Sequence, residues 1–364
     1  MSIYVSVCGD GFGHARRQAQ VIRELEKLDE IVVGCYDYEG YFRKLGFQTH
    51  LTSPELTFKG KGGKIDFKLS LVQTLKNLPG YKKESEALDL YKPEIVISDN
   101  RWTVLWLAWK RGIPTILVSN QTQANPMLAL NSGERALYGA FNTFFNVFLR
   151  FPTVVVIPDF PPPHAISKLN LMEKFCSKYV YLGPIIDENI RNAIPSDEGY
   201  VLTVVTGGKR LAFRAPILHY VKKTAEQMPW LEFKVISHFH SKRLRYKNLE
   251  VLPPQEDSAY VDYFRCAKMI ISPASLTLAH ERIYLAKKGI LIPDPYSEEW
   301  GNALRCYELE LFEVVPYRHL KSLPKVIEKV GQRRYERLEQ LSKLAREMRG
   351  EKNLAELVKR LLEN

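Results

Sequence analysis

Short apolar, β-branched runs alternate with amphipathic helical segments along the whole chain. Helical spacing of apolar residues marks Ala15–Leu28 and Lys64–Leu90. The predicted strands of the first half are Ile3–Val7, Glu30–Cys35, Ile95–Ser98, Thr115–Val118 and Thr153–Ile157. Those of the second half are Val201–Thr206, Phe233–Ser237, Met269–Ser272, Gly289–Pro293 and Glu313–Val315. Alternation of this kind predicts parallel sheets covered by helices on both faces.

A Pro- and Asp/Glu-rich segment near 184–198 separates the two series. A chain of 364 residues is also too long for one ordinary core. We therefore expect two doubly wound α/β domains, residues 1–184 and 185–339. The tail from Arg333 to Leu362 has apolar residues at helical spacing, and we expect a helix at about 340–364 that packs back on the first domain.

Charge is the unusual bulk feature. Lys and Arg number 52 against 41 Asp and Glu, for a net charge of +11. This balance favours an anionic partner such as nucleic acid, an anionic membrane face or a phosphorylated substrate, and a merely basic surface explains it equally well. The five cysteines are widely spread without Cys-x-x-Cys, which predicts reduced thiols in a cytoplasmic protein. No apolar run is long enough to span a bilayer, and residues 1–9 fit a first strand better than a signal peptide.

Ligands of doubly wound sheets bind outside the carboxyl ends of the strands, so the loops there carry the chemistry. The first loop, GDGFGHARR, combines Gly9, Gly11 and Gly13 with His14 at the start of a helix. A G-x-G-x-x-G dinucleotide fingerprint fails because its sixth position is His14, and neither Asp37 nor Glu39 is a clear ribose ligand. Neutral histidine is suited to take a proton near pH 7. The alternative is a histidine that only caps backbone groups.

The second loop, VVTGGKR, follows the first strand of the second half. Gly207 and Gly208 would let a phosphate approach backbone N–H groups, and Lys209 and Arg210 supply positive charge. The Walker motif is absent, and a plain strand-to-helix turn is the alternative.

The third region, SPASLTLAHERIYLAKKGILIPDPYSEEWGNALRCYEL, resembles the donor-binding signature of GT-B glycosyltransferases, especially the branch of the bacterial N-acetylglucosaminyltransferase that makes lipid II (family 28-like). The opening GDGFGHARR resembles the glycine-rich loop of that family, and its Gly-His-Ala-x-Arg form is most similar to archaeal and bacterial members. The matching residues of the third region are Ser275, Thr277, Glu281, Ile290–Pro293, Glu298, Glu299, Asn302 and Ala303.

Two departures from the signature affect the expected contacts. One extra residue separates Thr277 from Glu281, so Ser275 is the alternative hydroxyl for the phosphate. Glu298 and Glu299 stand where the relatives often have Gln-Gln or Asp-Gln, in a pair that contacts the donor sugar.

The resemblance implies an inverting glycosyltransferase whose two Rossmann-like domains face across a cleft, with a nucleotide-sugar (UDP-linked) on the second domain. It implies that Glu281 accepts from the ribose hydroxyls, that the 207–210 loop and the 275–277 turn hold the diphosphate, and that Gln255 lies against the base. His14 would take the acceptor's proton, and Asp99 would orient it, with a helix N-cap as the alternative role for Asp99. Gly9, Gly11, Gly13 and Arg17 form the acceptor loop.

We expect no metal and no cofactor, because the chain has no Asp-x-Asp and helix N-termini with basic side chains can hold the leaving group. His238 and His240 alternate on a strand or turn without further ligands nearby. Two other functions stay open: a nucleotide-sugar 2-epimerase of the same fold, and a basic nucleic-acid-binding protein, for which no RNP-like stretch, zinc knuckle or basic helix is present.

An aromatic segment, RALYGAFNTFFNVFLRF, bears on the acceptor. Phe141, Phe144, Phe145 and Phe148 recur at the spacing of one helical face. Such a stripe is usually core. The alternative is an interfacial helix whose flanking arginines meet anionic headgroups, with a lipid-linked acceptor and the protein at the inner face of the membrane.

Overall fold

The computed structural model describes residues 2–9, 12–55, 60–61, 64–65, 72–74, 76–129, 132–197, 199–205, 214–255 and 257–363. The chain forms two compact units. The first comprises Met1–Phe58, Phe67–Ile186 and Met348–Asn364, and the second comprises Lys59–Asp66 and Asp187–Glu347.

The first unit is built on a seven-stranded sheet of order β3-β2-β1-β6-β7-β8-β9. All six pairings are parallel. The strands are β1 (Ser2–Val7), β2 (Glu30–Cys35), β3 (Gln48–Leu51), β6 (Ile95–Asp99), β7 (Thr115–Val118), β8 (Val154–Ile157) and β9 (Tyr179–Tyr181). β1 lies between β2 and β6, so the order of the strands reverses direction at this point of the sheet.

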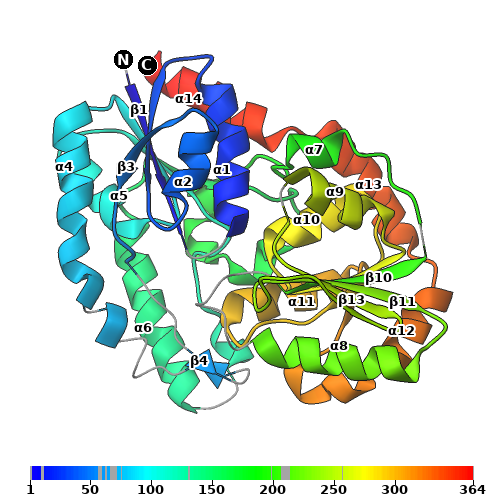
Figure 1. Ribbon diagram of the computed structural model, residues 1–364. Coiled ribbons are helices and arrows are strands. Elements are labelled where there is room, and N and C mark those ends of the chain that lie inside the picture. Colours follow the sequence, from blue (N-terminus) through cyan, green and yellow to red (C-terminus); the bar gives the residue numbers. More distant parts are fainter. Residues whose placement is uncertain are drawn as a thin grey trace. The chain divides into compact units, whose positions relative to one another are not determined.

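The alternation of side chains along β1 explains why both faces of this sheet are covered. Ile3, Val5 and Val7 pack in one core with α1 (Phe12–Leu25) and α14 (Gly350–Leu362). Tyr4 points to the opposite core, which α4 (Tyr81–Tyr91) and α5 (Trp102–Trp109) complete. Figure 1 shows α14, in red at the end of the chain, beside the dark blue α1. The tail therefore contributes to the core of the first unit, with Leu354 and Val358 fully buried.

The aromatic segment forms α6 (Ser132–Phe148), and its stripe packs inward. Phe145 is 6% exposed, and Phe141, Phe144 and Phe148 are partly buried against the same core. Trp102 contacts Phe145 with ring centroids 5.0 Å apart and Phe144 at 5.8 Å. These contacts support the core interpretation of the stripe, because its rings pack on the sheet of the first unit.

The second unit repeats the architecture, with sheet order β12-β13-β11-β10-β14-β15-β16. Only the edge strand β12 is antiparallel. The strands are β10 (Tyr200–Val205), β11 (Glu232–Ser237), β12 (Leu244–Tyr246), β13 (Leu249–Leu252), β14 (Met269–Ser272), β15 (Gly289–Leu291) and β16 (Glu313–Val314). Its longer helices are α8 (Ala215–Gln227), α9 (Asp257–Cys266), α10 (Leu276–Tyr284), α11 (Ser297–Glu308), α12 (Leu323–Gln332) and α13 (Glu336–Glu347).

Two predicted helices differ from the structure. The Lys64–Leu90 helix is wrong at its start, because Lys64–Ile65 is strand β5, paired with β4 (Gly60–Lys61). Residues 72–74 and 76–77 are helical as predicted, and α4 begins at Tyr81 after a 3-10 turn at Leu78–Gly80. The helical tail consists of two helices, because α13 ends at Glu347 and α14 begins at Gly350. α13 belongs to the second unit and α14 to the first.

No helix within the described ranges is long and apolar enough to cross a membrane.

Candidate functional site

The first predicted loop lies where the strand order of the first sheet reverses, which is the usual ligand position in a doubly wound sheet. β1 and β6 are adjacent, with Val7 paired to Asp99, so the loop after β1 starts beside the end of β6. Gly9 is needed here because a Cβ would lie 2.4 Å from the Tyr36 carbonyl oxygen. Gly11 falls outside the described residues, and Gly13 is the second residue of α1.

His14, Arg17 and Asp99 converge at this position. His14 Nδ1 lies 3.0 Å from Asp99 Oδ1, and Arg17 Nη2 donates to the same oxygen at 2.5 Å. Asp99 is fully buried and Arg17 is 5% exposed, whereas His14 keeps 23% of its side chain exposed. The histidine is therefore the member of this group that solvent or a ligand can reach.

The charges around Asp99 keep its carboxylate ionised. Burial alone would raise the pKa of Asp99, but the positive charge of Arg17 and the contact with His14 outweigh burial and lower this pKa. An ionised Oδ1 accepts a hydrogen bond only from a protonated Nδ1, so the other ring nitrogen, Nε2, carries the lone pair of the neutral imidazole. The geometry thus presents a basic nitrogen on the exposed side of the ring.

The strand end that carries Asp99 is held by further buried contacts. Arg101 Nη2 donates to Glu84 at 2.7 Å, and the Tyr4 hydroxyl donates to Glu84 at the same distance. Burial and the charge of Glu84 raise the pKa of Tyr4. Glu55 accepts from the backbone N–H of Trp102 at 2.8 Å and of Thr103 at 3.1 Å, so it caps α5. The N-cap residue of α5 is Arg101 and not Asp99, and the side chain of Arg101 makes no capping hydrogen bond.

The donor residues predicted in the second unit follow the carboxyl ends of its strands. Residues 207–210 lie outside the described residues. Ser275 is the N-cap of α10, and its side chain makes no cap bond. Thr277 is partly exposed in the first turn of the same helix. Gln255 is partly exposed after β13, with its amide donating to Pro253 O at 2.5 Å.

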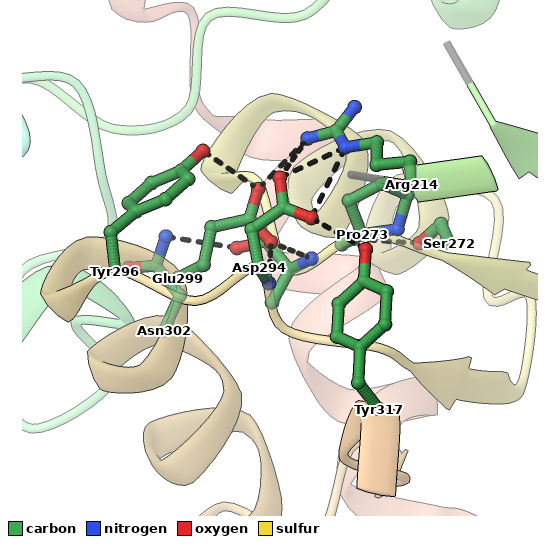
Figure 2. Close-up of polar contacts among 9 residues, drawn as sticks. Arg214, Ser272, Pro273, Asp294, Tyr296, Glu299, Asn302 and Tyr317 are labelled. Atoms are coloured by element: carbon green, nitrogen blue, oxygen red, sulfur yellow. Dashed lines mark hydrogen bonds and ion pairs between the residues drawn. The ribbon is translucent and has the colours of Figure 1, made fainter. Parts of the chain in front are cut away.

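Glu299 lies at the centre of a buried network shown in Figure 2. Its Oε2 accepts from the backbone N–H of Ala274 at 2.6 Å and of Asp294 at 3.1 Å. Its Oε1 lies 3.4 Å from both Arg214 Nη2 and the Tyr296 hydroxyl. Glu299 therefore ties the turn after β14 to the loop after β15. These contacts lie within the protein, and the expected contact of Glu299 with the donor sugar stays a prediction.

Arg214 and Asp294 complete this network. Arg214 Nε donates to Asp294 Oδ2 at 2.9 Å, and the Tyr317 hydroxyl donates to Asp294 Oδ1 at 3.0 Å. Burial, and next the charge of Asp294, raise the pKa of Glu299 to about 8 against the opposing charge of Arg214. Two buried carboxylates thus share one guanidinium, which disfavours ionisation of Glu299.

Asn302, Glu298 and Glu281 complete the predicted donor set. Asn302 Nδ2 donates to Ala274 O at 3.0 Å and so holds the same turn as Glu299, while Glu298 is partly exposed. The contact of Glu281 with the ribose stays a prediction. Glu281 lies in the second turn of α10, is 1% exposed, and its Oε2 accepts from the Tyr260 hydroxyl at 3.2 Å. Burial means that this residue also supports the fold.

Sequence reasoning missed Arg214, Asp294, Tyr296 and Tyr317. The sequence offered a signal for Asp294, because this residue directly follows Pro293 of the donor-binding signature. It offered none for Arg214, which lies 80 positions away in the chain. Among the described residues, no group of three His, Cys, Asp or Glu side chains comes together as metal ligands. His238 lies just after β11, where burial and then the charge of Arg214 lower its pKa.

Comparisons with known proteins agree on the class of protein. Proteins described as "Uncharacterized glycosyltransferase" from Methanosarcina acetivorans and Methanosarcina mazei are each 26% identical to this chain and align over 99% of it and 98% of their own length. The glycotransferase of kitacinnamycin has a TM-score of 0.72 at 16% identity, covering 99% of this chain and 98% of its own.

Two further solved structures share the fold over nearly their whole length. The spinosyn rhamnosyltransferase SpnG, solved with thymidine diphosphate, has a TM-score of 0.69 at 14% identity and full coverage of both chains. MurG of Acinetobacter baumannii has a TM-score of 0.61 at 12% sequence identity, with 99% of each chain covered. These likenesses confirm the predicted GT-B fold of two Rossmann-like α/β domains.

The model of the family described as "Glycosyl transferase family 1" matches residues 1–320 of this chain. The prediction of a GT-B glycosyltransferase is confirmed, and the finer resemblance to the lipid II branch remains a hypothesis. By this match over most of its length, the chain belongs to glycosyl transferase family 1.

Proposed function

We propose that the protein transfers a sugar, with inversion and without a metal ion, from a nucleotide-sugar to an acceptor hydroxyl, and that His14 is the base. The observation that carries this proposal is the 3.0 Å contact between His14 Nδ1 and the buried, ionised Asp99 at the reversal point of the first sheet. A carboxylate in this position fixes the ring and stabilises the imidazolium that forms.

In the proposed reaction the acceptor oxygen attacks the anomeric carbon as its proton moves to His14 Nε2. The bond from that carbon to the diphosphate oxygen breaks, and the nucleoside diphosphate leaves with the electron pair. Inversion follows from this single displacement. Arg17 and Asp99 act through His14, because both contact the ring side at Nδ1 and neither is exposed.

The leaving group requires donors that stabilise negative charge. The turn that precedes α10 offers backbone N–H groups at a helix N-terminus, and Ser275 and Thr277 bring hydroxyls to it. The 207–210 loop would add two glycines, Lys209 and Arg210. In support, SpnG was solved with thymidine diphosphate. We propose a nucleoside diphosphate at this strand edge, with uridine as the first base to test and Glu281 as the ribose ligand.

Donor binding is testable without the acceptor. UDP- and TDP-sugars should raise the unfolding temperature of the protein, because a ligand of the folded state stabilises it. Glu281→Gln should lose most of this shift, since it removes the charge but keeps the volume and one acceptor for Tyr260. Glu226→Gln, an exposed change on α8, is the matched control. An unchanged shift in Glu281→Gln would remove this residue from the donor site.

The same donors distinguish transfer from epimerisation. Incubation with a nucleotide-sugar alone should release nucleoside diphosphate slowly as water replaces the acceptor. Conversion of the donor into its 2-epimer, without release, would replace our proposal with an isomerase.

A further inference from the structure

The second unit has a basic cavity at the amino ends of its strands. The proposed donor residues follow the carboxyl ends of the same sheet. Lys268 directly precedes β14, and Lys287 and Lys288 directly precede β15. Because these strands are parallel, their amino ends share one edge of the sheet. The cavity has a volume of about 310 Å³. Its lining residues are Asp197, Lys268, Ala286, Lys287, Lys288, Gln332, Arg333, Arg334, Tyr335, Leu338 and Glu339.

The cations of this lining outnumber its acids by five to two, and most of them are already paired. Lys287 contacts Asp197 at 2.9 Å, and Arg334 lies 3.6 Å from Glu339. Arg333 contacts Glu310 and Glu313, each at 3.1 Å. Lys268 and Lys288 are different, because neither forms an ion pair with any residue that the structure describes.

The environment of Lys288 disfavours its charge. Lys268 is exposed, and Lys288 is partly buried with its ammonium donating to Gly331 O at 3.0 Å. Burial, and next the charge of Lys268, lower the pKa of Lys288, although Asp197 opposes this. The cavity thus holds two positive charges without an ion-paired carboxylate of their own, and an anion between them would reduce their repulsion.

We infer that this cavity is a second ligand site, which binds a phosphate group through Lys268 and Lys288. Its volume is at the lower end of small-molecule sites, roughly 300–1,000 Å³. Lysine ammonium groups bind phosphate as point charges with several donors. The phosphate belongs to a small soluble molecule or to a lipid headgroup. Nothing in the proposed transfer reaction uses these residues, so this site stands or fails separately from the proposed function.

The experiment compares the whole protein with the double variant Lys268→Ala/Lys288→Ala and with Lys223→Ala, which removes an exposed lysine of α8. Unfolding temperatures are measured in chloride and in inorganic phosphate at equal ionic strength. Co-sedimentation uses vesicles of phosphatidylcholine alone and vesicles in which one third is phosphatidylglycerol.

Phosphate should raise the unfolding temperature of the unchanged protein and of Lys223→Ala, and this rise should disappear in the double variant. In chloride the double variant should be at least as stable as the unchanged protein, because a repulsion is removed. Phosphate stabilisation without sedimentation assigns the site to a soluble ligand. Sedimentation with anionic vesicles that the double variant loses, and that free phosphate competes with, assigns it to headgroups. Equal responses of all three proteins to phosphate and to both vesicles would overturn the inference.

Discussion

At the residue scale, one buried oxygen organises the candidate site. Asp99 Oδ1 receives both His14 Nδ1 and Arg17 Nη2, and the two donors are 3.1 Å apart because they share this acceptor. The charge of Arg17 helps to keep Asp99 ionised, and the carboxylate of Asp99 would stabilise the imidazolium that forms on His14 during transfer.

Replacement of Arg17 tests this support of Asp99. In Arg17→Ala the buried carboxylate loses its partner charge, so the His14 ring should be held less firmly. We expect turnover to fall at near-normal donor affinity, and Arg17→Lys to restore part of it. Equal turnover in all three proteins would show that Arg17 only supports the fold.

Glu299 should make stability depend on pH. Its folded pKa of about 8 lies above the ordinary value near 4.3, so the folded state binds this proton more tightly than the unfolded chain does. The resulting stability is full below about pH 4 and is lost as pH rises through about 8. Urea denaturation between these limits should show a fall that Glu299→Gln lacks. The same slope in both proteins would show that Glu299 is ionised throughout.

At the scale of elements, the predicted strands agree closely with the observed ones, because β-branched runs mark buried parallel strands whatever surrounds them. In the two large sheets β3, β9, β12 and β13 were missed. All of these but β13 lie at sheet edges and are partly exposed, with weaker apolar runs. The start of the Lys64–Leu90 helix failed since helical spacing does not exclude a hairpin. For α6, periodicity identified the stripe but not the surface that it covers. Trp102 and the sheet decide that question, and the spacing of apolar residues within α6 gives no information about either.

The packing of α6 gives a quantitative prediction. Phe145→Ala should lower the free energy of unfolding by about 3 kcal/mol or more, since it empties a buried ring position against Trp102. Val147→Ala, on the exposed side of the same helix, should cost less than about 0.5 kcal/mol. Urea denaturation measures both. A small loss for Phe145→Ala would return the stripe to a role outside the core.

At the scale of the whole molecule, sequence alternation was sufficient to predict two doubly wound domains, and the comparisons confirm the fold. The place of His14 beside Asp99 was also predictable, because the carboxyl ends of adjacent parallel strands meet. The Arg214–Asp294–Glu299 network was not, since it joins the start of α8 to the loop after β15 and the first turn of α11, and Arg214 lies 80 positions before Asp294 in the chain. α14 packs on α1 through Leu354 and Val358. Helical spacing alone does not predict which unit these two residues contact.

The central claim is that one unit supplies the base while the other binds the donor. It is tested most directly by measuring nucleoside diphosphate release and donor affinity together, for the unchanged protein, His14→Ala and Glu281→Gln. We expect His14→Ala to lose roughly a hundredfold or more in turnover at near-normal donor affinity. In Glu281→Gln the main loss should be in affinity for the donor. Unchanged turnover in His14→Ala, with the donor still bound, would contradict the account.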